Sequence, residues 1–345
     1  MTLTMMPEPP TAGTGSDFAL LSERIARAGL MQRRPAYYAL RIAAVAAAYI
    51  VSVTVFVLTG DSWAQMVVAA AMSIVFVQVA LVAHDLAHRQ VFQSRRRSQI
   101  AGMIAGNLGI GMSYGWWMDK HTRHHANPNH EERDPDVAPD LLVWSADQAR
   151  AAKGLPRFIG RWQAYLFFPL LLLEGLNLHV ASGRALLGRQ GMRGRTVEIL
   201  LFAAHVIGYL GVVFAVLPVG KALLFIAIHQ GLFGLYLGCT FAPNHKGMPM
   251  AHEGMDFLRK QVLTSRDVTG SRLMDAALGG LNHQIEHHLF PSMPSPNLRR
   301  AKPIVRQFCA EIGVPYQETG LIDSYRLALR HLYEVGAPVR KVSPG

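Results

Sequence analysis

Histidines recur at ligand spacing in three short segments of the chain. The first segment contributes His84 and His88, which are four residues apart. The polar members of the other two segments are His121, His124 and His125, then Gln284, His287 and His288. Residues three and four apart lie on one face of a helix, where their side chains can share a ligand. The three segments together therefore predict a metal site.

No single segment is specific for a metal. A zinc protease would carry glutamate directly after its first histidine, whereas this chain carries Asp85, which could orient an imidazole from behind. His124 and His125 would point about 100° apart on a helix, which suits two ions better than one. We expect His245 to supply an eighth imidazole, with Asn244 beside it and Gln284 as weak or outer ligands.

The remaining histidines are interpreted individually. Core or surface roles are expected for His179, His205, His229, His252 and His331. His130 and His283 stay undecided, because each lies beside a segment without filling its pattern, and His283 competes with Gln284 as a ligand.

The ligand set favours iron. Eight imidazoles overfill a tetrahedral zinc site, and the two cysteines, Cys239 and Cys309, form no CxxC pair. Imidazole suits iron, and two ions with three to five protein ligands each would leave room for oxygen. Soluble di-iron bundles use Glu-x-x-His pairs, which these segments lack. A histidine-rich centre with two non-haem irons is the prediction.

Composition indicates a membrane protein. Of the 345 residues, 50% are hydrophobic and only 17% are charged. The net charge of +11 fits arginine-rich cytosolic loops better than nucleic-acid binding, so no nucleic-acid partner is expected. Membrane lipids are the expected surroundings.

Apolar segments predict an all-α integral membrane protein with four transmembrane helices. The expected spans are residues 40–59, 65–83, 197–217 and 222–241, paired into two hairpins by short turns. Both termini, the histidine segments and a helical cap would then lie on the cytosolic side. The expected divisions are a disordered or interfacial segment over 1–30, a membrane domain over 31–298 and a cytosolic helical tail over 299–345.

Shorter segments between the spans carry weaker signals. Residues 17–30 predict an amphipathic helix at the membrane surface, after a disordered lead-in over residues 1–16. Residues 100–112 are too short to cross and predict a re-entrant or interfacial helix. Residues 127–161 are interpreted as a loop, and residues 165–180 as an interfacial helix kinked at Pro169.

The spacing resembles that of the membrane fatty acid desaturases, whose boxes read HxxxH, HxxHH and H/QxxHH. The segment Gln284-Ile285-Glu286-His287-His288-Leu289-Phe290-Pro291 resembles the front-end, or linoleoyl-CoA desaturase-like, branch. The resemblance covers about residues 36–298 and implies that the seven box histidines and His245 bind iron, with Gln284 in the glutamine position. His283 stands where the branch usually has an aromatic residue.

This resemblance implies an O2-dependent desaturase acting on a fatty acyl chain linked to coenzyme A, a lipid or a carrier protein. The chain lacks the HPGG motif of a fused cytochrome b5, so a separate donor such as ferredoxin or a flavin reductase is expected. Unactivated methylene groups have no acidic proton, so an oxidising metal must remove their hydrogens. Arg89, Lys120 or Arg123 would hold the polar head, unless they only anchor lipid headgroups.

Two alternatives remain open. A membrane di-iron hydroxylase of alkyl, sterol or carotenoid substrates would use the same site, although the QxxHH form favours desaturation. A metal-binding membrane transporter would place its site near the bilayer midplane, whereas these segments fall at helix ends.

Overall fold

The computed structural model describes residues 16–188 and 194–340, which are mostly helical. The expected disordered lead-in therefore lies outside the described residues, apart from Ser16. Ser16 accepts a hydrogen bond from the amide of Ala19 and so caps α1 (Asp17–Arg27). The apolar side of α1, with Leu21 and Ile25, packs against α11 and α14.

Four helices are long and apolar enough to cross a membrane. They are α2 (Pro35–Thr59), α3 (Gln65–Ala87), α9 (Arg195–Val216) and α10 (Val219–His245). The four expected spans are therefore present as helices, and α3 and α10 continue four residues beyond the predicted ends. These extensions matter, because they carry His84 and His245 on helical backbone.

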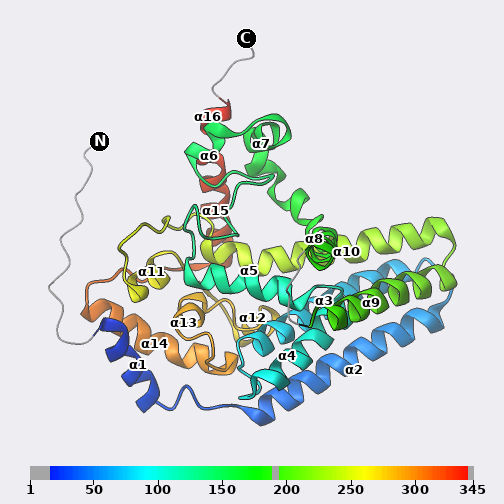
Figure 1. Cartoon of the computed structure of the whole chain (residues 1–345), viewed down its shortest axis with the longest axis horizontal. Coiled ribbons are helices and arrows are strands. Elements are labelled where there is room, and N and C mark those ends of the chain that lie inside the picture. The colour runs from blue at the N-terminus through cyan, green and yellow to red at the C-terminus, as the bar shows by residue number, and fades with distance from the viewer. Residues whose placement is uncertain (1–15, 189–193, 341–345) are drawn as a thin grey trace.

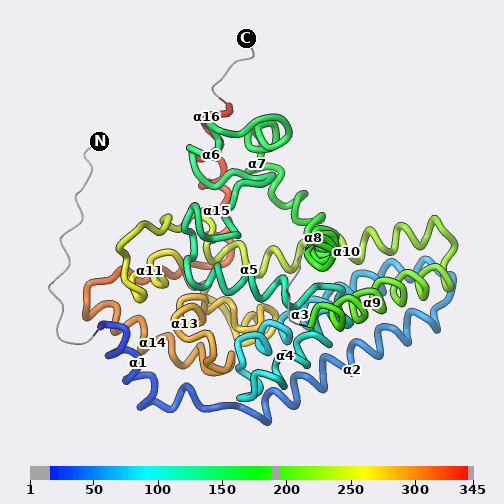
Figure 2. Tube along the Cα trace, in the orientation of Figure 1, coloured from blue at the N-terminus to red at the C-terminus, as the bar shows by residue number. Residues whose placement is uncertain are grey.

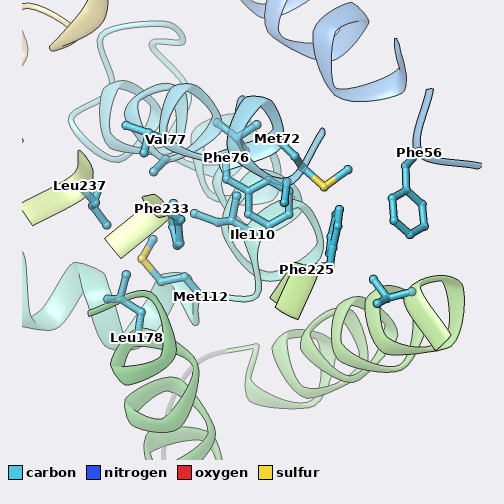
Figure 3. Packing of buried hydrophobic residues seen from close by; sticks show 14 of the residues in the cluster. Phe56, Met72, Phe76, Val77, Ile110, Met112, Leu178, Phe225, Phe233 and Leu237 are labelled. Carbon is cyan, nitrogen blue, oxygen red and sulfur yellow. The ribbon is translucent and has the colours of Figure 1, made fainter. Parts of the chain in front are cut away.

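The four long helices lie together in one bundle, with α3 packed directly against both α2 and α10 (Figure 1). The main apolar core lies between α3, α10 and their neighbours (Figure 3). Phe76 of α3 and Phe225 and Phe233 of α10 are fully buried there. Ile110 and Met112 enter the same core from the segment before the second histidine box.

The short turns of the two helix pairs lie at the same end of the bundle (Figure 2). Lys221, at the start of α10, reaches Asp61 in the α2–α3 turn at 2.6 Å. The histidine segments lie toward the opposite end. Which side of a membrane each end faces, and whether the pairs are membrane hairpins, stay predictions.

The segment before the second box is helical, as expected, and the segment after the box is more helical than expected. Residues 100–112 are divided between α4 (Arg95–Met103) and a π-helix, η1 (Ile104–Gly109), followed by α5 (Tyr114–Ala126). The loop predicted over residues 127–161 is wrong in its second half, which forms α6 (Ala146–Ala151) and the start of α7 (Gly154–Leu171). Proline in the first turn of α7 is compatible with helix, and Ile159, Gln163 and Phe167 form its buried face.

The predicted kink near Pro169 is present as a sharp bend. Helix α7 ends at Leu171, and α8 (Glu174–Gly188) leaves it at 84°. Proline removes a helix hydrogen bond and crowds the preceding turn, which explains why α7 ends within three residues. At this bend the chain crosses α10 closely: a Cβ on Gly234 would lie 2.4 Å from the backbone nitrogen of Gly175.

The chain after α10 folds beside the histidine end of the bundle (Figure 1). Its elements are α11 (Phe257–Leu263), β1 (Asp267–Thr269), α12 (Arg272–Ala277), α13 (Gln284–Leu289), α14 (Ser295–Glu311), β2 (Glu318–Gly320), α15 (Leu321–Val335) and α16 (Ala337–Arg340). β1 and β2 pair in parallel, with Val268 opposite Thr319. The domain boundaries stay predictions, although the one expected at residue 298 falls inside α14.

Replacing Gly234 should test the close crossing of α8 and α10. Gly234→Ala places a methyl group against the backbone of Leu171 and Gly175, and we expect it to lower stability by about 1–3 kcal/mol. Thermal unfolding of detergent-purified protein measures this. Gly208→Ala on α9 is the matched control, since nothing lies within 4 Å of its added Cβ. Equal melting temperatures for the two variants would contradict the crossing.

Candidate metal centre

The first box lies where α3 ends. His84 is in the last turn of α3, and His88 is the residue that caps it. Arg89 follows with a φ of 55°, a left-handed conformation that stops the helix. Asp85 does not hydrogen-bond an imidazole: its carboxylate pairs with Arg41 of α2 at 2.7 Å and stands 3.6 Å from Nδ1 of His84.

The second box occupies the last two turns of α5. Ser113 caps the helix by accepting from the amide of Trp116. Glu198, buried in the first turn of α9, accepts from the Ser113 hydroxyl at 2.7 Å and from the Gly115 amide. These bonds fix the start of the helix that presents His121, His124 and His125.

The third box is the short helix α13, and all of its residues are buried. Asp267 of β1 accepts from the amide of Ile285 at 3.1 Å, which satisfies one of the free donors at the helix start. His245 is the last residue of α10. Arg266 donates to the carbonyl of Pro243 near that helix end, and its own amide donates to the carbonyl of Asn244.

All eight predicted imidazoles come together, in two groups. The larger group consists of His84, His88, His121, His125 and His287, whose ring nitrogens lie within 4.8 Å of one another. The smaller group consists of His124, His245 and His288. Adjacent histidines of the second and third boxes thus fall into different groups, as their directions on a helix predict.

In the smaller group every ring makes a hydrogen bond through its Nδ1 atom. Nδ1 of His124 donates to Asp134 at 3.0 Å, and Nδ1 of His245 donates to the carbonyl of Thr264 at 3.0 Å. Nδ1 of His288 donates to Oε1 of Gln261 at 2.9 Å, while Nε2 of Gln261 donates to the carbonyl of His125. In its neutral form each ring then carries its lone pair on Nε2. Although burial opposes it, the carboxylates of Asp136 and Asp134 raise the pKa of His124.

In the larger group the ring nitrogens face one another. Nε2 of His121 lies 2.8 Å from Nε2 of His88 and 3.1 Å from Nε2 of His125. Both nitrogens of His84 and of His287 are buried and have no hydrogen-bond partner. Burial, reinforced by neighbouring histidines, lowers the pKa of His88, His121, His125, His287 and His288, so these rings stay neutral, as metal ligands must.

These donors fit metal ions on chemical grounds. Nε2 of His245 and Nε2 of His288 are both lone-pair atoms, yet they lie 3.1 Å apart. Lone pairs at this distance repel unless a cation or a proton lies between them, and buried nitrogens without partners are costly. The donor set is imidazole, which suits iron, zinc and copper.

Gln284 lies beside the smaller group. Its Nε2 is 2.9 Å from Nε2 of His245, and its Oε1 accepts from Asn244 at 3.3 Å. Asn244 in turn donates to the carbonyls of Thr240 and Leu281. Asn244 therefore orients Gln284 from behind. Direct binding of a metal through Oε1 would require the Gln284 amide to reverse.

His283 lies outside both groups. Its Nε2 donates to Asp275 at 3.1 Å, and its Nδ1 faces Asp267. The other histidines are also apart from the centre: His179, His205 and His229 belong to α8, α9 and α10, His331 belongs to α15, and His130 and His252 lie in loops. His283 and Gln284 were the alternative ligands expected from the sequence, and Gln284 is the one that lies next to the imidazoles.

Sequence reasoning missed the groups that hold the rings. Asp134 is buried and accepts from the ring of His124 and from the backbone amide of Asn129. Although burial opposes it, the hydrogen bond from His124 lowers the pKa of Asp134, which stays ionised. Trp117 was also missed, and its ring stacks on His121 at 4.4 Å. The acidic run after the second box was the available signal for Asp134.

Two of the three basic residues expected to hold a polar head group pair with carboxylates, and the third contacts an arginine through its backbone carbonyl. Lys120 pairs with Asp136 at 2.9 Å, and Arg123 pairs with Asp119 at 3.3 Å. The carbonyl of Arg89 accepts from Arg33. The head-group role of these three residues stays a prediction.

An apolar helical bundle that ends in a set of eight clustered imidazoles defines a multi-pass membrane protein with a histidine-rich arrangement that could hold metal ions. A family model described as fatty acid desaturase matches residues 61–320. The chain therefore belongs to the fatty acid desaturase family.

Individual relatives agree with this family. The chain is 30% identical over 335 residues to the acyl-lipid (9-3)-desaturase of Physcomitrium patens, covering 94% of this chain and 64% of that protein. It is 29% identical over 321 residues to fatty acid desaturase 3 of Bos taurus, covering 90% and 71%. It is 26% identical over 345 residues to a delta(8)-fatty-acid desaturase of Helianthus annuus, covering 95% and 74%.

The matched region does not extend over the whole of every relative. The chain spans 64% of the length of the acyl-lipid (9-3)-desaturases of Physcomitrium patens and Borago officinalis.

Asp134→Asn should weaken metal binding. The variant keeps the shape of the side chain but removes the charge that orients His124, and outer partners of this kind change metal affinity by roughly 10–100-fold. Iron per chain, measured by elemental analysis after dialysis against a graded chelator series, should fall at lower chelator concentration than in the unmodified protein. Asp140→Asn, at an exposed carboxylate, is the control. Identical release curves would show that Asp134 does not support the centre.

Proposed function

We propose that the chain is an O2-dependent fatty acyl desaturase that introduces a cis double bond into an acyl chain. The observation that carries this proposal is the two groups of imidazoles, five of the eight rings buried, at one end of an apolar bundle. The family and the names of the relatives support the same reaction.

The two groups suit two iron ions. The larger group would hold one ion through His84, His88, His121, His125 and His287, and the smaller would hold the other through His124, His245 and His288. Gln284 and Asn244 would act at the smaller group, whereas Asp85 would stand near the first box through its pair with Arg41 and not through a bond to a ring. When bound, the irons would supply the oxidising power that unactivated methylene groups require, with O2 as co-substrate.

Apolar residues connect the bundle core to the imidazoles. Trp117 and Phe241 both pack on the main core, and their rings lie 5.8 and 6.3 Å from the ring of His84. An acyl chain that reaches His84 would therefore meet apolar side chains along its length. Five of the eight imidazoles are buried, which would limit the access of water to the reacting carbons near them.

The membrane arrangement follows from the same geometry. We propose two helical hairpins, with the short turns on the outer side and the histidine end, the helical cap and both termini in the cytosol. The substrate would be linked to coenzyme A, a lipid or a carrier protein. Two electrons would come from an external carrier such as ferredoxin or a flavin reductase.

Product analysis tests the reaction. Lipids from a host that expresses the chain should contain new monoene or polyene species, two mass units lighter per double bond, when examined by mass spectrometry. An empty-vector host is the control. An alcohol without an alkene would instead identify a hydroxylase. Purified protein that holds zinc and no iron after iron-replete growth would contradict an oxidative enzyme and favour a metal-binding transporter.

Single histidine variants test the ligands. We expect His124→Ala and His287→Ala to abolish activity and to lower iron content, because each removes a ring from one group. His331→Ala, on α15, should change neither. Iron per chain and alkene yield are measured on equal amounts of monodisperse protein. Equal losses in all three variants would mean that folding, and not ligation, is being measured.

A further inference from the structure

A third cluster of ligand-type side chains lies outside the two histidine groups. It consists of Asp267 of β1, His283, which precedes α13, and Glu286 in the first turn of α13. Their ligand atoms lie within 4.8 Å of one another, and all three residues are buried. None of them belongs to either imidazole group.

The hydrogen bonds of His283 leave one nitrogen free for this cluster. Its Nε2 lies 3.1 Å from a carboxylate oxygen of Asp275, which also receives hydrogen bonds from Arg299 and Asn282. Because an ionised carboxylate only accepts, Nε2 carries the ring proton and Nδ1 carries the lone pair. Nδ1 is buried without a hydrogen-bond partner and lies 3.6 Å from Oδ2 of Asp267. A carboxylate behind a histidine is the usual support of a metal-binding ring.

The two carboxylates are not balanced by their neighbours. Tyr316 lies 2.8 Å from Oδ2 of Asp267 and 2.9 Å from Oε1 of Glu286, but its hydroxyl has a single proton to donate. The ammonium of Lys302 is 3.7 Å from Asp267 and is held by Glu318 at 2.6 Å. Oε2 of Glu286 is buried without any partner. Burying paired carboxylates with this little compensation is costly.

We propose that Asp267, His283 and Glu286 bind a divalent transition-metal ion, separate from the ions of the two histidine groups. One imidazole nitrogen with carboxylate oxygens suits Mn²⁺, Fe²⁺ or Zn²⁺. Calcium would need six to eight oxygen ligands, which this cluster does not offer. The ion joins β1 to the start of α13 and so holds the third histidine box from the side that faces away from the imidazoles.

Elemental analysis of the purified full-length chain tests the site. Protein is expressed with iron, manganese and zinc supplied, and metal ions per chain are counted after gel filtration. Asp267→Asn removes the charge but keeps Oδ1 as acceptor for the Ile285 amide. We expect the variant to lose about one ion per chain while it keeps the ions of the histidine groups. Glu318→Gln, beside Lys302 but outside the cluster, should lose none.

A reciprocal variant separates this site from the proposed function. His84→Ala combined with His287→Ala should lose iron from the larger histidine group and retain the ion lost in Asp267→Asn. His283→Asn removes only the nitrogen donor of the cluster. It replaces Asp267→Asn in the metal count if Asp267→Asn does not yield monodisperse protein. Neither measurement of metal ions per chain depends on desaturase activity.

Two results would overturn the proposal. The first is the same metal content in the unmodified protein, Asp267→Asn and His283→Asn. The second is a His84→Ala, His287→Ala variant that holds no metal at all. Either would mean that a shared proton, and not a metal ion, joins the two carboxylates.

Discussion

Repulsion between imidazole lone pairs is the constraint on which the arrangement of this protein depends. Eight imidazoles gather in one region, five of them buried, and several of their nitrogens approach one another to about 3 Å. Neutral rings would supply too few protons to satisfy these contacts, and bound cations would make the arrangement favourable. The helix ends, caps and buried polar side chains around the centre hold the rings in place against this repulsion.

The two groups are held in different ways. In the smaller group each ring donates a hydrogen bond through Nδ1, to Asp134, to the carbonyl of Thr264 or to Gln261. These hydrogen bonds fix the tautomer and the orientation of the rings. In the larger group, His84 and His287 have no hydrogen-bond partner, and packing positions the rings, as where Trp117 stacks on His121. Hydrogen bonds specify a direction more sharply than packing does. The protein itself therefore organises the smaller group more completely, whereas the larger group depends more on the ion.

Sequence reasoning found the residues with periodic or repeated signals. The four long apolar runs and the histidine spacing are local properties, so α2, α3, α9 and α10 and the eight imidazoles could all be predicted. The partners that only the tertiary structure brings next to these residues could not be predicted. Gln261 lies 27 residues before His288 and is an ordinary amide in the sequence, and Glu198 caps a helix 83 residues before it. The loop predicted over residues 127–161 failed in its second half, where Pro156 lies in the first turn of α7, a position that tolerates proline.

The histidines of the metal centre are distributed over several helices, so the packing of these helices affects the distances between the histidines. Helix α3 ends in the larger group, and α10 ends in the smaller group. These two helices contact each other directly, so the separation of their axes sets the separation of the two groups. Helices α5 and α13 each carry an adjacent pair of histidines, His124 with His125 and His287 with His288. Each pair contributes one ring to the larger group and one ring to the smaller group. A shift of α5 or α13 would therefore disturb both groups at once, while a change in the apolar contact of α3 with α10 would alter the distance between them.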